Sequence, residues 1–150
     1  MPLDPIVRLT AESDIRNLIA RLGHLADDGD PDEYLGLWTE DGVWDRGNGE
    51  AHRGREALRE RVLAYRASGL QGPGTGTKHL NTTLWVSIDS DDRAHAQSYF
   101  VFLTGASNAI ALELDAPRPQ IALSGRYDDE FVRTGAGWRI RSRTITVDVS

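Results

Sequence analysis

Residues 120–149 read QIALSGRYDDEFVRTGAGWRIRSRTITVDV and give a clear secondary-structure signal within the 150-residue chain. The two halves of this stretch, 120–134 and 137–149, contain many β-branched and aromatic residues, and the sequence TGAG joins them. A short glycine-containing connection between two such runs is typical of an antiparallel hairpin. We therefore predict two long strands that pair through a tight turn.

Two more strand-like segments, residues 79–88 and 93–104, precede this hairpin. The acidic sequence DSDD joins them, and a longer connector that includes Pro117 and Pro119 leads on to residue 120. Successive strands with such connections predict an antiparallel meander over the second half of the chain.

The first half of the chain shows helical patterns. Apolar residues recur at helical spacing over residues 11–28, and Gly29 follows as a stop signal. Asp30-Pro31-Asp32-Glu33 combines an N-cap, a first-turn proline and a capping-box glutamate, so it predicts a second helix that runs to about Thr39. Gly54-Arg55-Glu56 opens a third predicted helix, in which Leu58, Val62 and Tyr65 share one face.

Between the second and third helices we predict two short strands, 43–46 and 50–53, around the turn Gly47-Asn48-Gly49. The glycine-rich segment from Ala67 to Lys78 is predicted to be a mobile loop, and it lacks the spacing of a phosphate-binding motif. Helices thus come before a run of antiparallel strands. This order favours an α+β fold with the helices packed on one face of the sheet.

Length and composition limit the function classes. The chain is long enough for one domain, residues 1–150, and a net charge of −6 without a basic block argues against nucleic-acid binding. There is no cysteine to form a disulfide, a thiolate metal ligand or a nucleophile. No apolar run is long enough to span a membrane, and the N-terminus lacks a signal-peptide pattern, so we expect a cytoplasmic protein without membrane partners.

The four histidines, His24, His52, His79 and His95, show no metal-binding spacing, and no GxSxG motif of a serine hydrolase is present. The pattern therefore predicts neither a metal site nor another cofactor. His52 and His95 are expected on exposed strand edges.

Asp27 and His79 are the main candidates for chemistry. At 100° per residue, Asp27 lies about 120° from Ile15, at the edge of the apolar helix face, where a partly desolvated carboxylate can reach a cavity. The alternative is an ordinary acidic residue beside solvent in the last turn. His79 shares one face of its strand with Asn81 and Trp85 by alternation, and this face either lines a polar pocket or meets solvent. A bulge would exchange the two faces further along the strand.

An aromatic and a basic residue are further candidates. Most of the four tryptophans are expected in the core, but we place Trp44, on the short strand after the second helix, at the mouth of a cavity. Arg139, Arg141 and Arg143 alternate along the last strand. Such a row usually faces solvent, but an arginine turned inward there would bind an anion or a carbonyl.

Several stretches together resemble the SnoaL-like branch of the NTF2-like superfamily. They are IRNL at 15–18 with DDGD at 27–30, LWTEDGVW at 37–44, GREAL at 54–58, TKHLN at 77–81 and GWRI at 137–140. The resemblance covers nearly the whole chain. It implies a cone in which a curved antiparallel sheet wraps around three N-terminal helices and a deep pocket opens at one end. It also implies a homodimer, or a higher homo-oligomer, through the outer face of the sheet.

Within this superfamily the pattern is similar to that of scytalone dehydratase and hexachlorocyclohexane dehydrochlorinase. These enzymes set an aspartate at the end of the first helix against a histidine that opens the strand after the third helix, which implies that Asp27 and His79 form a catalytic pair. Trp44 corresponds to a pocket tryptophan of the dehydrochlorinase, and Arg143 to an arginine of its final strand.

This sequence differs from scytalone dehydratase in two ways that affect the expected reaction. Ala26 stands where scytalone dehydratase has a tyrosine, and residues 99–104 lack the second pocket histidine of that enzyme. Tyr65 and Tyr99 are the candidate substitutes for the missing hydroxyl.

The sequence therefore predicts a small cofactor-independent enzyme that acts on a hydrophobic, cyclic small molecule. His79 is expected to be the general base and Asp27 to orient it. Dehydration by a lyase, isomerisation and polyketide-type cyclisation through an enolate all remain open. The alternative is a non-catalytic protein of the same fold that binds a small molecule or acts in assembly.

Overall fold

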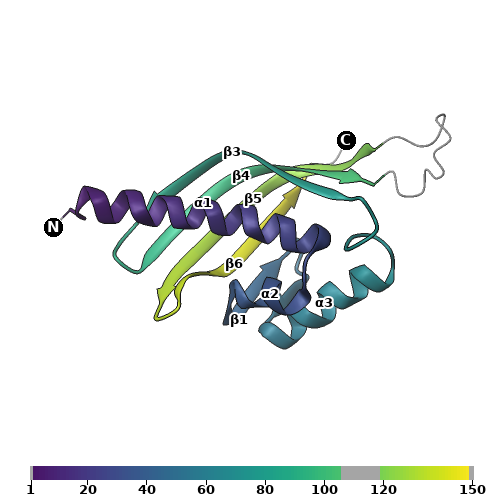
Figure 1. Ribbon diagram of the computed structural model, residues 1–150, viewed down its shortest axis with the longest axis horizontal. Coiled ribbons are helices and arrows are strands. Elements are labelled where there is room, and N and C mark those ends of the chain that lie inside the picture. The colour runs from purple at the N-terminus through teal and green to yellow at the C-terminus, as the bar shows by residue number, and fades with distance from the viewer. Residues whose placement is uncertain (1, 106–118, 149–150) are drawn as a thin grey trace.

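The computed structural model describes residues 2–105 and 119–148, in which three helices and six strands are arranged in one layer each (Figure 1). The helices are α1 (Pro5–Asp28), α2 (Pro31–Gly36) and α3 (Arg55–Ala67). The strands are β1 (Trp38–Asp45), β2 (Ala51–Arg53), β3 (Lys78–Ile88), β4 (Arg93–Thr104), β5 (Gln120–Thr134) and β6 (Gly137–Val147). Most of the predicted connector before residue 120, and residue 149 at the end of the predicted last strand, lie outside the described residues.

The two N-terminal helices differ from the prediction at their ends. α1 begins at Pro5 rather than at residue 11, because the side chain of Asp4 accepts hydrogen bonds from two backbone N–H groups of the first turn. Asp30 caps α2 in the same way, as predicted. This helix ends at Gly36 rather than Thr39, because the chain enters β1 at Trp38.

The strands form one sheet in the order β2-β1-β6-β5-β4-β3, with antiparallel neighbours except for the parallel pair of β1 and β6. The long strands β3 to β6 match the predicted meander to within two residues at each end. Figure 1 shows the sheet curving around α1, with α2 and α3 beside β1. The predicted α+β class is confirmed.

A β-bulge in β3 changes which residues face the helices. Thr82 pairs with Tyr99 and Trp85 with Gln97, so β3 holds one extra residue between these pairs. Thr83 has φ 49°, a conformation that a β-branched residue adopts only under strain. The expectation that Trp85 shares a face with His79 is therefore wrong, because alternation restarts at the bulge and Trp85 lies on the outer face.

The core lies between α1 and the inner face of the sheet. The apolar face of α1 supplies Ile15, Ile19 and Leu22, and the sheet supplies large side chains such as Phe100 and Phe131, all of them fully buried. Burial of this apolar surface is the main stabilising contribution to such a fold. Since α1 is apolar along its core-facing stripe up to its last turn, its C-terminal residues are held firmly against β3. No helix in the described parts of the chain is long and apolar enough to cross a membrane.

Candidate functional site

The last turn of α1 brings a carboxylate to the first residues of β3. Asp27 is only 8% exposed, and each of its oxygens accepts a hydrogen bond from His79. Oδ1 lies 2.6 Å from the ring Nδ1, and Oδ2 lies 2.9 Å from the backbone nitrogen. The backbone bond fixes the strand against the helix, so the ring and the carboxylate meet in one orientation.

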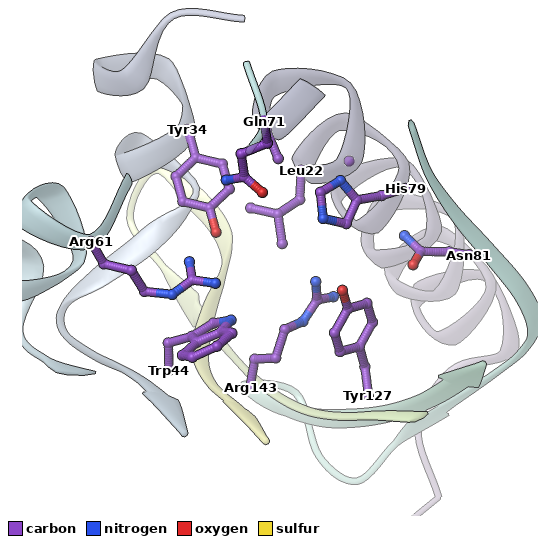
Figure 2. A pocket seen from close by; sticks show the side chains of 11 residues that line it. Leu22, Tyr34, Trp44, Arg61, Gln71, His79, Asn81, Tyr127 and Arg143 are labelled. Atoms are coloured by element: carbon purple, nitrogen blue, oxygen red, sulfur yellow. The ribbon is translucent and has the colours of Figure 1, made fainter. Parts of the chain in front are cut away.

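The contact with Asp27 determines which nitrogen of His79 is available. A carboxylate only accepts hydrogen bonds, so Nδ1 carries the proton and Nε2 keeps its free lone pair. The ring of Phe102 lies 4.7 Å away between centroids and supports the imidazole from the side. The His79 side chain is 17% exposed and faces the cavity (Figure 2). The arrangement is suited to a histidine that accepts a proton at Nε2 while the carboxylate stabilises the resulting imidazolium.

The cavity beside His79 is narrow, with a volume of about 30 Å³, and it adjoins a compartment of about 100 Å³. Its wall combines polar and aromatic side chains with part of α1. The lining residues are Leu22, Gly23, Ala26, Tyr34, Trp44, Arg61, Gln71, His79, Asn81, Tyr127 and Arg143 (Figure 2). An adjoining, more apolar compartment shares Trp44, Arg61, Gln71, His79 and Tyr127 with it. The additional residues of that compartment are Arg46, Tyr65, Leu70, Phe100, Phe102, Leu123, Ile145 and Val147.

A buried ion pair lies at the floor of the cavity. Arg143 donates from Nε and Nη2 to the two oxygens of Asp129, each at 2.7 Å, and its guanidinium lies 3.8 Å from the ring centre of Tyr127. Burial opposes the charge of Arg143, but the carboxylate of Asp129 outweighs this effect and raises the pKa of Arg143 above its ordinary value. Burial also raises the pKa of Tyr127 to about 12, so its hydroxyl is neutral at physiological pH.

The structure brings most of the predicted site residues together. Trp44 and Arg143 line the cavity with His79, and Tyr65 lines the adjoining compartment. Tyr99 does not line either compartment. It is 55% exposed on the outer face of β4, because its neighbours on the strand face inward. The prediction that Tyr99 lies in the pocket is therefore wrong.

Several cavity residues were not among the predicted site residues, and four of them are Tyr34, Arg61, Gln71 and Tyr127. Tyr34 lies on α2, Arg61 lies on α3, and Gln71 lies in the glycine-rich segment. Tyr127 could have been found, because β5 alternates and places Tyr127 and Asp129 on the same face as the buried Phe131. The buried positions of Gln71 and Thr77 show that the glycine-rich segment packs against the rest of the domain in this structure, whereas its mobility stays a prediction.

Within residues 2–105 and 119–148, no group of three or more histidine, aspartate or glutamate side chains is placed to hold a metal ion. The chemistry that the described site offers is therefore that of a histidine, carboxylates, arginines and hydroxyls.

Comparison with known proteins places the chain in a family. The family model described as a SnoaL-like domain matches residues 7–144. No curated protein matches significantly. Among solved structures, an NTF2-like protein with a cystatin-like fold from Novosphingobium aromaticivorans aligns with a TM-score of 0.77 and 28% identity, over 95% of this chain and 85% of that chain. The NTF2-like fold implied by the resemblance is thus confirmed.

Two more distant structures share the fold. One, also from Novosphingobium aromaticivorans, is named "Putative Scytalone Dehydratase" and aligns with a TM-score of 0.74 and 18% identity, over 94% of this chain and 86% of that chain. The other, from Catenulispora acidiphila, was solved in complex with S-DNPA and aligns with a TM-score of 0.74 and 23% identity, over 94% of this chain and 96% of that chain.

Proposed function

The chain belongs to the SnoaL-like domain family, and from this membership and the cavity geometry we propose that it is a small enzyme that moves protons on a cyclic, largely hydrophobic metabolite without a cofactor. The contact between Asp27 and His79 at the wall of the cavity is the observation that carries this proposal. A neutral imidazole oriented by a buried carboxylate is a general base of the kind that such reactions need.

In the proposed reaction His79 Nε2 removes a proton from a carbon next to a carbonyl group. The electron pair of the C–H bond forms an enolate, and His79 becomes an imidazolium that Asp27 stabilises. In an elimination the enolate then expels a β-hydroxyl group, which takes the proton from the imidazolium and leaves as water. In an isomerisation the imidazolium returns the proton to another carbon. Elimination is our first choice, and isomerisation and cyclisation share its first step.

The cavity supports a hydrophobic ring as substrate. Trp44 offers a flat aromatic wall, and the adjoining compartment adds Phe100, Phe102 and Ile145. The neutral hydroxyl of Tyr127 lies in the wall shared by both compartments, where it can donate a hydrogen bond to a carbonyl oxygen. We therefore include Trp44, Tyr65 and Arg143 with the dyad in the proposed site.

A non-catalytic ligand-binding role is the second candidate. The inward-facing positions at the end of β4 hold Phe100 and Phe102, so this strand contributes no second histidine to the cavity. A protein that only binds its ligand needs no such group. This observation favours the alternative, and the experiment below separates the two functions.

Solvent deuterium incorporation into a panel of cyclic ketones, followed by NMR in D2O, tests the proposed function because it needs only the first step. We expect His79→Ala to lower the rate of exchange by about 10²- to 10⁴-fold, the usual contribution of a general base. His95→Ala is the matched control: His95 also binds a carboxylate, that of Asp89 at 2.9 Å, but lies outside the cavity. Ketones that bind without any exchange in the wild-type protein would favour the non-catalytic role instead.

The outer face of the sheet supports a further proposal, that two copies of the chain associate through it. Leu80, Trp85 and Tyr99 are 43%, 55% and 55% exposed there, and adjacent strands β3 and β4 carry them. Exposed aromatic and aliphatic side chains on one sheet face are typical of an interface between protein chains.

A further inference from the structure

Arg61 is a second arginine in the cavity, and it comes from α3 rather than from the sheet. Its guanidinium lies 3.4 Å from the ring centre of Trp44 and 4.6 Å from that of Tyr65. Figure 2 shows this group turned toward the centre of the cavity, opposite His79 and beside Tyr34. The two aromatic rings thus hold the guanidinium in place without neutralising its charge.

Arg61 and Arg143 differ in their partners. Asp129 neutralises Arg143 through two hydrogen bonds. No carboxylate of residues 2–105 or 119–148 forms an ion pair with Arg61, and its buried Nε has no hydrogen-bond partner among these residues. A buried donor without an acceptor costs free energy, and in a cavity wall an acceptor on a bound ligand can satisfy it.

The charges around the cavity lead to the same conclusion. Asp129 forms an ion pair with Arg143, and Asp27 accepts a hydrogen bond from His79. The positive charge of Arg61 remains in a poorly solvated place: burial lowers the pKa of Arg61, although a guanidinium stays protonated at physiological pH. Because no carboxylate of the described residues pairs with it, the guanidinium of Arg61 is locally complementary to a negatively charged group of a ligand.

We propose that Arg61 binds a carboxylate group of the substrate, so that the cavity binds cyclic organic acids more tightly than neutral compounds of the same shape. This inference names the substrate class of the proposed function and rests on it in that respect. The planar guanidinium can donate two parallel hydrogen bonds to a carboxylate. The ring attached to the carboxylate would then extend from Arg61 across the cavity toward His79 (Figure 2).

Direct binding tests this proposal without any need for turnover. The probes are benzoate, cyclohexanecarboxylate and 2-naphthoate, each compared with its neutral amide by isothermal titration calorimetry or ligand-observed NMR. We expect each acid that binds to do so about 10- to 100-fold more tightly than its amide, as for a charge-assisted hydrogen bond. Arg61→Gln should remove this preference. Arg59→Gln is the matched control on the same helix, because Arg59 pairs with Asp32 outside the cavity and its loss should leave the preference unchanged.

The outcomes separate this proposal from the proposed function. Acids that bind to His79→Ala as tightly as to the wild type support a role for Arg61 even if no proton exchange is ever detected. A panel in which no acid binds better than its amide overturns the proposal, and this comparison uses the wild-type protein alone, so it holds even if Arg61→Gln does not fold. An acid preference that persists in folded Arg61→Gln overturns it as well.

Discussion

Asp27 binds His79 at two points, through the ring Nδ1 at 2.6 Å and the backbone N–H at 2.9 Å. The two bonds have different functions. The backbone bond joins the end of α1 to the start of β3, and the ring bond sets the tautomer that leaves Nε2 free to accept a proton. A change that removes only the charge of Asp27 should therefore affect catalysis more than folding.

Asp27→Asn tests this separation. The side-chain oxygen of asparagine can still accept one bond, but its NH2 group donates and cannot pair with a protonated Nδ1. If the amide group meets the ring, the proton moves to Nε2 and the base is lost, so we expect the exchange rate to fall by about 10²- to 10⁴-fold. The melting temperature, measured by circular dichroism, should change little.

The matched control is Asp89→Asn, which makes the same change in the exposed pair with His95. Exchange at a near-normal rate in Asp27→Asn, with the control also unchanged, would show that His79 does not depend on this carboxylate.

The sequence patterns were sufficient to predict the α+β class and the four long strands, because strand alternation, capping residues and apolar helix faces are local features. The pairing of Asp27 with His79 was implied only by the resemblance to the SnoaL-like branch, since helix and strand geometry left both residues with a solvent-exposed alternative. The predicted alternation of inward and outward side chains along β3 breaks down at Thr83, where a bulge exchanges the two strand faces. An unbroken run of strand-forming residues gives no sign of such a bulge. The place of Trp85 could therefore not be predicted.

The cavity wall was harder to predict than the dyad. Arg61 and Gln71 line the cavity because α3, which packs against β1 and β2, and the segment that follows it lie beside the cavity. Their local sequence is polar, which is normal for a solvent-exposed surface. Contacts of this kind depend on tertiary packing, and the spacing of residues along the sequence does not predict them.

The ion pair of Arg143 and Asp129 gives a prediction about stability. Both side chains are buried, so removal of one partner leaves the other without compensation. We expect Asp129→Asn to lower the free energy of unfolding by about 3–5 kcal/mol. Chemical denaturation measures this change. Asp128→Asn is the control, because the neighbouring Asp128 pairs with Arg126 at the surface, and there the expected loss is about 0–1 kcal/mol. Equal losses in the two variants would contradict the prediction.

The raised pKa of Tyr127 leads to a prediction of how the free energy of unfolding changes at alkaline pH. Burial raises its pKa from 10.0 to about 12, so the folded protein keeps the proton that the unfolded chain loses above pH 10. The stabilising contribution is complete below the unfolded pKa and is lost as the pH rises toward the folded one. Between about pH 9 and about pH 11, the free energy of unfolding should therefore fall by about 1 kcal/mol more in the wild type than in Tyr127→Phe.

Urea denaturation at the two pH values measures the difference for Tyr127. Tyr99→Phe serves as the control, because Tyr99 is exposed on the outer face. In this variant the free energy of unfolding should fall between the two pH values as much as it does in the wild type. If Tyr127→Phe declines as steeply as the wild type, the phenol is not held neutral by the fold.

The outer face of the sheet predicts the oligomeric state. If two copies pack through Leu80, Trp85 and Tyr99, sedimentation equilibrium should give twice the 16.6 kDa mass of one chain. In a two-fold interface each substitution occurs on both sides, so Trp85→Glu brings two charges into an apolar contact and should shift the protein to monomers. Ile6→Glu is the control, because Ile6 is even more exposed than Trp85 but lies on α1, away from this face. A wild-type protein that stays monomeric at high concentration would rule out this interface, and so would a Trp85→Glu variant that dimerises normally, because neither result is compatible with burial of Trp85 between two copies.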